Sequence, residues 1–256
     1  MNNFRFLLLV KLLVLNSLLF SLRLQAQETA QAIVKKMDDY AHGASCVMVE
    51  KIEIIRPDWK RDMTVKIWTK ESTKYAMMLI KEPVRDKGVS YLKRLFEAWN
   101  WQPSIERTIK LPPSTMMQSW MGSDATNDDM IKVSSIVVDY THKLLKDTVI
   151  EGHSCYVIEA LPKEDASVIW GKIHLYITKD HYVTMLTKSY DEEGMLVRDL
   201  VNHDLKKYGE KWYPSWSEVI PADKKNQKTI SRIVSIEWDK PLNENFFSLL
   251  NVKNLE

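Results

Sequence analysis

Residues Trp99 to Asp129 read WNWQPSIERTIKLPPSTMMQSWMGSDATNDD, and the local pattern changes twice within them. The start is typical of a strand, because Trp99 and Trp101 are two positions apart and share one face. Pro103 interrupts this strand, the alternation resumes over residues 105–109, and the prolines at 112 and 113 end it. We therefore expect these residues to join a curled sheet to the segment that covers it.

A methionine-rich segment, MMQSWM, follows the prolines and contains Met116, Met117, Trp120 and Met121. Methionine is flexible and polarizable, so such a surface accepts variable hydrophobic partners. Ordinary core packing is the alternative for each residue. We interpret the segment as part of a lid over a hydrophobic cavity.

The polar run over residues 123–129 resembles a calcium loop superficially. It lacks the acidic 1, 3, 5 order, the central glycine and the distal glutamate of such loops. We predict a capping turn instead, in which Ser123, Asp124 or Asn127 caps a short helix and the carboxylates lie near its positive end.

Residues 1–26 are predicted to be a secretory signal peptide. Two early positive charges, Arg5 and Lys11, accompany an almost wholly apolar run from Phe6 to Phe20, and Ala26 supplies a small residue for cleavage. The alternative is a transmembrane anchor, but Lys11 shortens the apolar run well below the roughly 20 residues that a span needs. We expect an exported protein that is not an integral membrane protein.

The charge of the remaining chain is close to neutral. The signal carries three of the 36 basic residues and none of the 34 acidic ones, so its removal changes the net charge from +2 to about −1. Proteins that bind nucleic acid usually concentrate positive charge, so no nucleic-acid partner is expected.

The rest of the chain predicts a mainly β (α+β) domain over residues 27–256. Residues 28–42 follow the helical period, and Gly43 ends that helix. Alternating runs then predict about ten or eleven strands. We expect one curled antiparallel sheet that forms an incomplete half-barrel, with the N-terminal helix and short lid helices over its open side. Phe246 and Phe247 are expected to plug back onto the domain.

No catalytic, metal or cofactor motif accompanies this pattern. Ser119 and Ser123 lack the Gly-x-Ser-x-Gly setting, and His153 with Cys155 reads as a structural pair on one strand face. We therefore predict no enzyme activity, no catalytic residues, no metal and no cofactor. For Cys46 and Cys155 two states stay open, a disulfide if their strands are neighbours, or two buried free thiols.

The central stretch resembles the signature of the outer-membrane lipoprotein-sorting protein family, the LolA-like periplasmic carriers. The resemblance covers nearly all of the chain after the signal and rests on Trp99-x-Trp101-x-Pro103, Arg107-x-Ile109, Met121-Gly122-Ser123-Asp124, Tyr208-Gly209-x-x-Trp212-x-Pro214, Lys228-Thr229 and Leu242-Asn243-x-x-x-Phe247.

The resemblance implies a monomeric, non-enzymatic carrier in the periplasm of Gram-negative bacteria that binds lipid or lipoprotein acyl chains, with an inner-membrane transporter as a further partner. A lipid-sensing regulatory or transporter-accessory module on the same fold is the alternative function. The ligand-binding residues predicted for the cavity and lid are Trp99, Trp101, Arg107, Met116, Met117, Trp120 and Met121. Arg107 is the candidate that holds an anionic headgroup.

Overall fold

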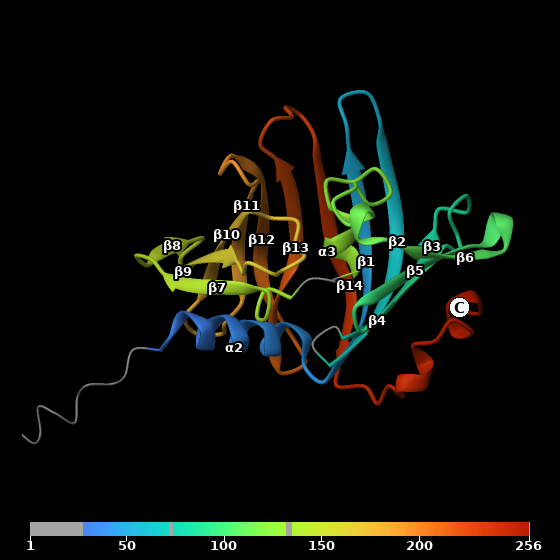
Figure 1. Cartoon of the computed structure of the whole chain (residues 1–256), viewed down its shortest axis with the longest axis horizontal. Coiled ribbons are helices and arrows are strands. Elements are labelled where there is room, and N and C mark those ends of the chain that lie inside the picture. The colour runs from blue at the N-terminus through green and yellow to red at the C-terminus, as the bar shows by residue number, and fades with distance from the viewer. Residues whose placement is uncertain (1–27, 72–73, 132–134, 256) are drawn as a thin grey trace, which may run out of the picture.

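The computed structural model describes residues 28–71, 74–131 and 135–255, and the signal-peptide prediction lies outside these ranges. The described residues form a single antiparallel sheet of 14 strands. This sheet is curled (Figure 1). Its strand order is β6-β5-β4-β3-β2-β1-β14-β13-β12-β11-β10-β9-β7, and β8 pairs with β9 beside this path. The strands are β1 Ser45–Ile55, β2 Lys60–Lys70, β3 Tyr75–Glu82, β4 Ser90–Arg94, β5 Glu97–Gln102, β6 Arg107–Leu111, β7 Tyr140–Leu144, β8 Thr148–Ile150, β9 His153–Pro162, β10 Lys172–Thr178, β11 Thr184–Tyr190, β12 Leu196–Tyr208, β13 Lys211–Pro221 and β14 Lys228–Trp238.

The curled, unclosed antiparallel sheet confirms the predicted half-barrel, but the predicted number of ten or eleven strands is wrong. The segment from Trp99 to Ile109 is a hairpin of β5 and β6, not one interrupted strand. The hairpin turns at a 3-10 helix, Pro103–Ile105, which is followed by Glu106 at φ 51°. The β4–β5 hairpin likewise turns at Leu95 with φ 56°. Both turns place a non-glycine residue in the left-handed region, so the usual glycine signal is missing.

The N-terminal helix α2, Ala30–His42, is confirmed within two residues of its predicted start. The hydroxyl of Thr29 accepts a hydrogen bond from the Ala32 amide at 3.2 Å, and Gly43 ends the helix at φ 59°. Its apolar side packs into a cluster with β9 and β10. The buried members of this first core cluster are Ala30, Ile33, Val34, Met37, Tyr140, Ile158, Ala160, Trp170, Ile173, Leu175 and Ile177. No helix in the described ranges is long and apolar enough to cross a membrane.

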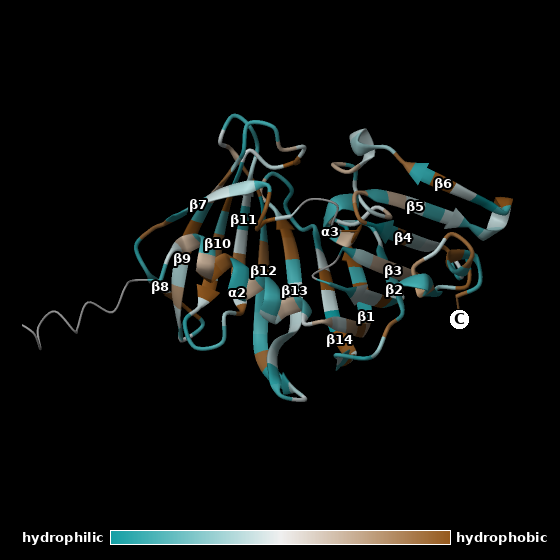
Figure 2. Ribbon diagram, turned by 60° about the horizontal axis from the view of Figure 1, so that its bottom comes forward, coloured by the Kyte–Doolittle hydropathy of each residue, from teal (hydrophilic) through white to brown (hydrophobic). Residues whose placement is uncertain are grey.

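A second core cluster occupies the concave side of β1 to β5. The segment that covers it, the covering segment, runs over residues 112–131 and ends in the short helix α3, Asn127–Ile131. Trp120 from this covering segment is fully buried, and its ring lies 6.3 Å from that of Tyr91. Figure 2 shows the strands banded in hydrophilic and hydrophobic colours, as expected when alternate side chains face opposite sides of a sheet.

A third core cluster lies on the other face of these strands and is closed by the C-terminal tail. Phe247 is fully buried there with Trp68, Tyr75 and Leu92. The hydroxyl of Ser90 donates to the carbonyl oxygen of Val252, which fixes the tail further along. The predicted return of the Phe246–Phe247 pair onto the domain is therefore confirmed.

The two cysteines are both buried and free. Cys46 lies on β1, which pairs with β2 and β14, whereas Cys155 lies on β9, which pairs with β7, β8 and β10. Because their strands are not neighbours, the two cysteines do not form a disulfide and are free thiols.

Candidate functional site

A cavity of about 950 Å³ lies between α2, the loop over residues 135–139 and the concave wall of β10 to β13. One end of it is apolar and is formed by Met37, Tyr140, Trp170, Ile173 and Leu175, all members of the first core cluster. A cavity of this size is at the upper end of the range found for small-molecule pockets. The half-barrel therefore encloses room for a ligand of considerable size.

A close backbone contact positions Trp170 at this apolar end. The Gly171 amide donates to the Tyr190 carbonyl oxygen at 3.0 Å, which ties the residue after Trp170 to the end of β11. A Cβ on Gly171 would lie 2.4 Å from the Asp191 carbonyl oxygen, so no other residue fits without a backbone shift.

The opening of the cavity carries exposed apolar side chains. Leu95 and Phe96 at the tip of the β4–β5 hairpin both line the cavity, and Phe96 is 86% exposed. Val138 from the loop over residues 135–139 lines it too and is 62% exposed. The Val138 carbonyl oxygen accepts a hydrogen bond from Lys163 Nζ at 2.6 Å.

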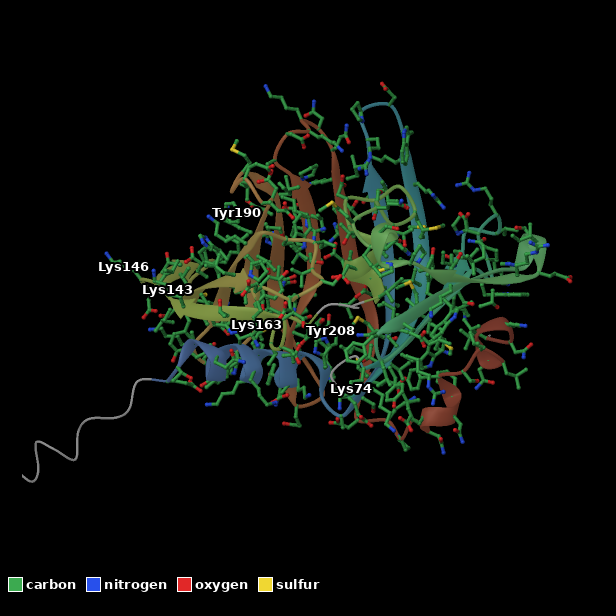
Figure 3. All side chains as sticks on the ribbon, viewed as in Figure 1. Lys74, Lys143, Lys146, Lys163, Tyr190 and Tyr208 are labelled. Carbon is green, nitrogen blue, oxygen red and sulfur yellow. The ribbon has the colours of Figure 1, made fainter. Side chains whose placement is uncertain are left out.

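Lysines gather along one edge of the sheet. Figure 3 shows Lys143, Lys146 and Lys163 on or near β7, and Lys74 further along the same side. Of these four lysines, Lys74 alone lines the cavity. Because β7 is an end strand of the sheet, lysines here discourage pairing with another chain. Their presence has this structural explanation without any ligand.

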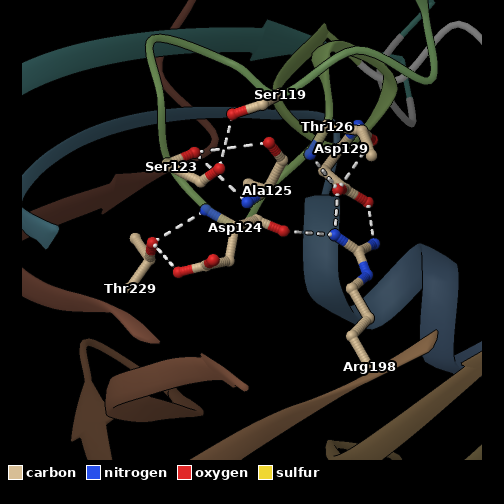
Figure 4. A network of polar contacts seen from close by, with 8 residues as sticks. All are labelled: Ser119, Ser123, Asp124, Ala125, Thr126, Asp129, Arg198 and Thr229. Atoms are coloured by element: carbon tan, nitrogen blue, oxygen red, sulfur yellow. Dashed lines mark hydrogen bonds and ion pairs between the residues drawn. The ribbon is translucent and has the colours of Figure 1, made fainter. Parts of the chain in front are cut away.

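An arginine from the sheet holds the covering segment in place. Arg198 on β12 is only 5% exposed, and its two Nη atoms lie 2.5 and 2.6 Å from the two Oδ atoms of Asp129 on α3 (Figure 4). It also donates to the Asp124 carbonyl oxygen at 3.1 Å. Its guanidinium group lies 4.6 Å from the centre of the Trp170 ring. Arg198 thus joins the covering segment, the sheet and the apolar end of the cavity.

Two further arginines bind the same segment. Arg56 Nη1 lies 2.9 Å from Asp124 Oδ2, and its Nη2 donates to the Gly122 carbonyl oxygen at 2.7 Å. Arg61 donates to the Met121 carbonyl oxygen at 3.0 Å. The sequence pattern predicted a functional role for none of these three arginines.

The predicted capping turn exists, but a different residue caps the helix. Thr126 Oγ1 accepts from the Asp129 amide at 3.2 Å, while Asp129 Oδ2 accepts from the Thr126 amide at 2.6 Å. This reciprocal pair corrects the prediction of Ser123, Asp124 or Asn127. Asp124 is instead engaged by Arg56 and by the hydroxyl of Thr229, which donates to Asp124 Oδ2 at 2.7 Å.

His142 on β7 links the edge strand to the loop at the cavity opening. Its Nε2 lies 2.8 Å from the carbonyl oxygen of Ile136, which lines the cavity. Burial lowers the pKa of His142, and nearby Lys163 acts in the same direction. The neutral imidazole, which can donate from Nε2, is therefore favoured in the folded protein.

None of the predicted ligand-binding residues is among those that line the cavity. Trp99 and Trp101 pack against the third core cluster, and Arg107 is exposed on β6. In the covering segment, Met116 and Trp120 are buried, Met121 packs against the second core cluster and Met117 is exposed. Their role in binding a ligand stays a prediction. Many of the lining side chains come from α2 and from β10 to β13, where no local motif marks them.

Comparisons with known proteins agree on the class of fold, a curled antiparallel half-barrel. The chain belongs to the family whose model, described as "Uncharacterized protein", matches residues 72–254. A search of curated proteins found no match. The predicted resemblance to outer-membrane lipoprotein-sorting proteins is confirmed at the level of the fold.

Three solved structures share the fold over most of their length. An outer membrane lipoprotein-sorting protein domain from Vibrio parahaemolyticus has 16% identity and a TM-score of 0.77, over 88% of this chain and 98% of that one. A DUF1329 family protein from Desulfovibrio piger has 19% identity and a TM-score of 0.79, over 87% of this chain and 97% of that one. A LolA superfamily protein from Nitrosomonas europaea has 20% identity and a TM-score of 0.73, over 86% of this chain and 98% of that one.

Proposed function

We propose that this protein is a non-enzymatic periplasmic carrier that binds lipid or lipoprotein acyl chains in its cavity and moves them toward the outer membrane. The observation that carries the proposal is the cavity of about 950 Å³, with its apolar end formed by α2, Trp170 and β10. Burying hydrocarbon there would stabilise a complex by about 0.8 kcal/mol for each methylene.

The covering segment supports reversible binding. It is joined to the sheet through ion pairs and hydrogen bonds from Arg198, Arg56 and Arg61. Polar contacts of this kind can be exchanged for water when the segment moves, whereas a ligand would gain by apolar contact. The exposed Leu95 and Phe96 at the opening would meet an entering chain first.

The names of two structural neighbours support the direction of transport. One is described as an outer membrane lipoprotein-sorting protein domain and another as a LolA superfamily protein. These proteins resemble this chain in fold, so its function has to be tested on the protein itself. The predicted absence of enzyme activity is part of the same proposal.

The test is native mass spectrometry of protein purified from its own periplasm, followed by lipid extraction and uptake of added lipid. Leu200→Trp should fill the cavity and abolish uptake, because Leu200 lines it from β12. Leu196→Trp is the matched control, since Leu196 lies on the same strand outside the lining and is exposed. Absence of any bound or acquired lipid in the unaltered protein would contradict the proposal. Release to acceptor vesicles would separate a carrier from a lipid sensor, which would retain its ligand.

A further inference from the structure

The concave wall of the cavity has a polar band beyond its apolar end. Asn202 on β12 stands directly across from Ser217 on β13, which in turn stands across from Ser231 on β14. Thr187 on β11 is paired with Leu200, the residue two before Asn202 on β12. Cross-strand partners share one face of a sheet, so these side chains form a continuous patch. Thr187, Asn202 and Ser217 line the cavity itself.

Several hydrogen-bonding groups of this band are not used by the protein. Among the described residues, no hydrogen bond is made by the hydroxyls of Thr187 and Ser217. Asn202 uses its Nδ2 to donate to the Thr184 carbonyl oxygen at 2.8 Å, which leaves its Oδ1 as an acceptor toward the cavity. A carrier of bare hydrocarbon would gain nothing from hydroxyl and amide groups at this depth.

The charges around the cavity disfavour an anionic ligand. Its lining contains six acidic side chains and four basic ones among the described residues. Lys35 and Arg198, two of the basic residues, are paired with lining aspartates, Asp39 and Asp129. Lys74 lies 3.7 Å from Glu71, which also lines the cavity. The formal charge of the lining is −2, four basic side chains against six acidic ones, which disfavours a carboxylate or phosphate headgroup.

We infer that the cavity takes an amphiphile with an uncharged, hydroxyl-bearing headgroup, of the chemical class of a monoacylglycerol. The acyl chain packs at the apolar end beside Trp170, and the headgroup exchanges hydrogen bonds with Thr187, Asn202 and Ser217. This inference rests on the proposed function, because it names the class of lipid that the same cavity binds.

The test compares 1-monooleoylglycerol with oleate, which has the same chain but an anionic head. The affinity of each lipid is measured by its displacement of an apolar fluorescent probe from the full-length mature protein. The assay is run at about pH 7.5, where the carboxylate of free oleate is ionised. We expect monooleoylglycerol to bind at least tenfold more tightly. The double variant Thr187→Val/Ser217→Ala should weaken the binding of monooleoylglycerol about 25-fold, since each of the two lost uncharged hydrogen bonds changes affinity about fivefold. The affinity for oleate should stay unchanged.

The control is Thr148→Val/Ser154→Ala, the same chemical change on the β8–β9 hairpin outside the cavity. It should leave both affinities unchanged, and thermal unfolding should show that all three proteins fold. Equal or tighter binding of oleate, or a variant that weakens both ligands alike, would overturn the inference while the carrier proposal stands. Failure of both lipids to displace the probe would overturn the two together.

Discussion

Arg198 and Asp129 form a two-point ion pair between strand β12 and helix α3, with Nη–Oδ distances of 2.5 and 2.6 Å. Arg198 is almost wholly buried, and Asp129 Oδ2 also accepts from the amide of Thr126. A single carboxylate therefore both completes the helix cap and receives the arginine. The position of the covering segment depends on this pair.

Removal of the arginine should loosen the covering segment. Arg198→Ala should destabilise the protein by about 2–4 kcal/mol, because it leaves a partly buried carboxylate without its guanidinium. Arg198→Lys should cost less, since a lysine keeps the charge but cannot make the two-point contact. Urea unfolding measures the loss, and hydrogen exchange over residues 112–131 should rise most.

Arg107→Ala is the matched control for this experiment. Arg107 is exposed on β6, so its removal should change the free energy of unfolding by no more than about 0.5 kcal/mol. An Arg107 variant as unstable as the Arg198 variant would mean that the covering segment is not held as described.

The two arginines illustrate what the sequence could predict. Alternation, caps and prolines predicted the curled sheet, α2 and the C-terminal plug, because these follow from local periodicity. Arg107 was predicted to bind a ligand because it lies close in sequence to the Trp99-x-Trp101-x-Pro103 motif. Arg198 lies 69 residues from its partner Asp129, and only the pairing of distant strands brings them together. The cavity lining was missed for the same reason.

The buried and exposed parts of the methionine-rich segment should respond differently to truncation. Trp120 is fully buried against Tyr91 and the second core cluster, so Trp120→Ala should cost about 3–5 kcal/mol. Met117 is 58% exposed, and Met117→Ala should be nearly neutral. Chemical denaturation of both variants measures the difference. Similar losses at the two positions would be inconsistent with this burial pattern.

The close approach at Gly171 should tolerate no side chain. Gly171→Ala should destabilise the protein by about 1–3 kcal/mol and reduce lipid uptake, because its Cβ would collide with the Asp191 carbonyl and displace neighbouring Trp170. Gly152→Ala is a control for a glycine on a turn, where a Cβ would meet nothing within 4 Å. That variant should be strained by its φ of 83° but should keep full lipid uptake. Full uptake by the Gly171 variant as well would contradict the link between this contact and the cavity.

Stability should depend on pH through His142. The folded protein lowers the pKa of His142, so the unfolded chain binds a proton more readily and folding favours the neutral ring. The stabilising contribution is therefore complete above the unfolded pKa of about 6.5 and declines as the pH falls below it. When the pH falls from about 7 to about 5, through the unfolded pKa of His142, the unaltered protein should lose stability more steeply than the His142→Gln variant. The variant has no titrating group at this position.

The same titration should be felt at the cavity. Burial disfavours protonated His142, and Lys163 acts in the same direction. His142 Nε2 lies beside the Ile136 carbonyl oxygen at the opening. Hydrogen exchange of residues 135–139 should therefore rise over the same acid range in the unaltered protein, with a smaller rise in the variant. Parallel pH profiles for stability and exchange in the two proteins would show that His142 does not carry the effect. A steeper acid loss in the unaltered protein alone would tie the order of the opening to this one imidazole, because the glutamine of the variant keeps a side-chain donor but cannot gain a charge.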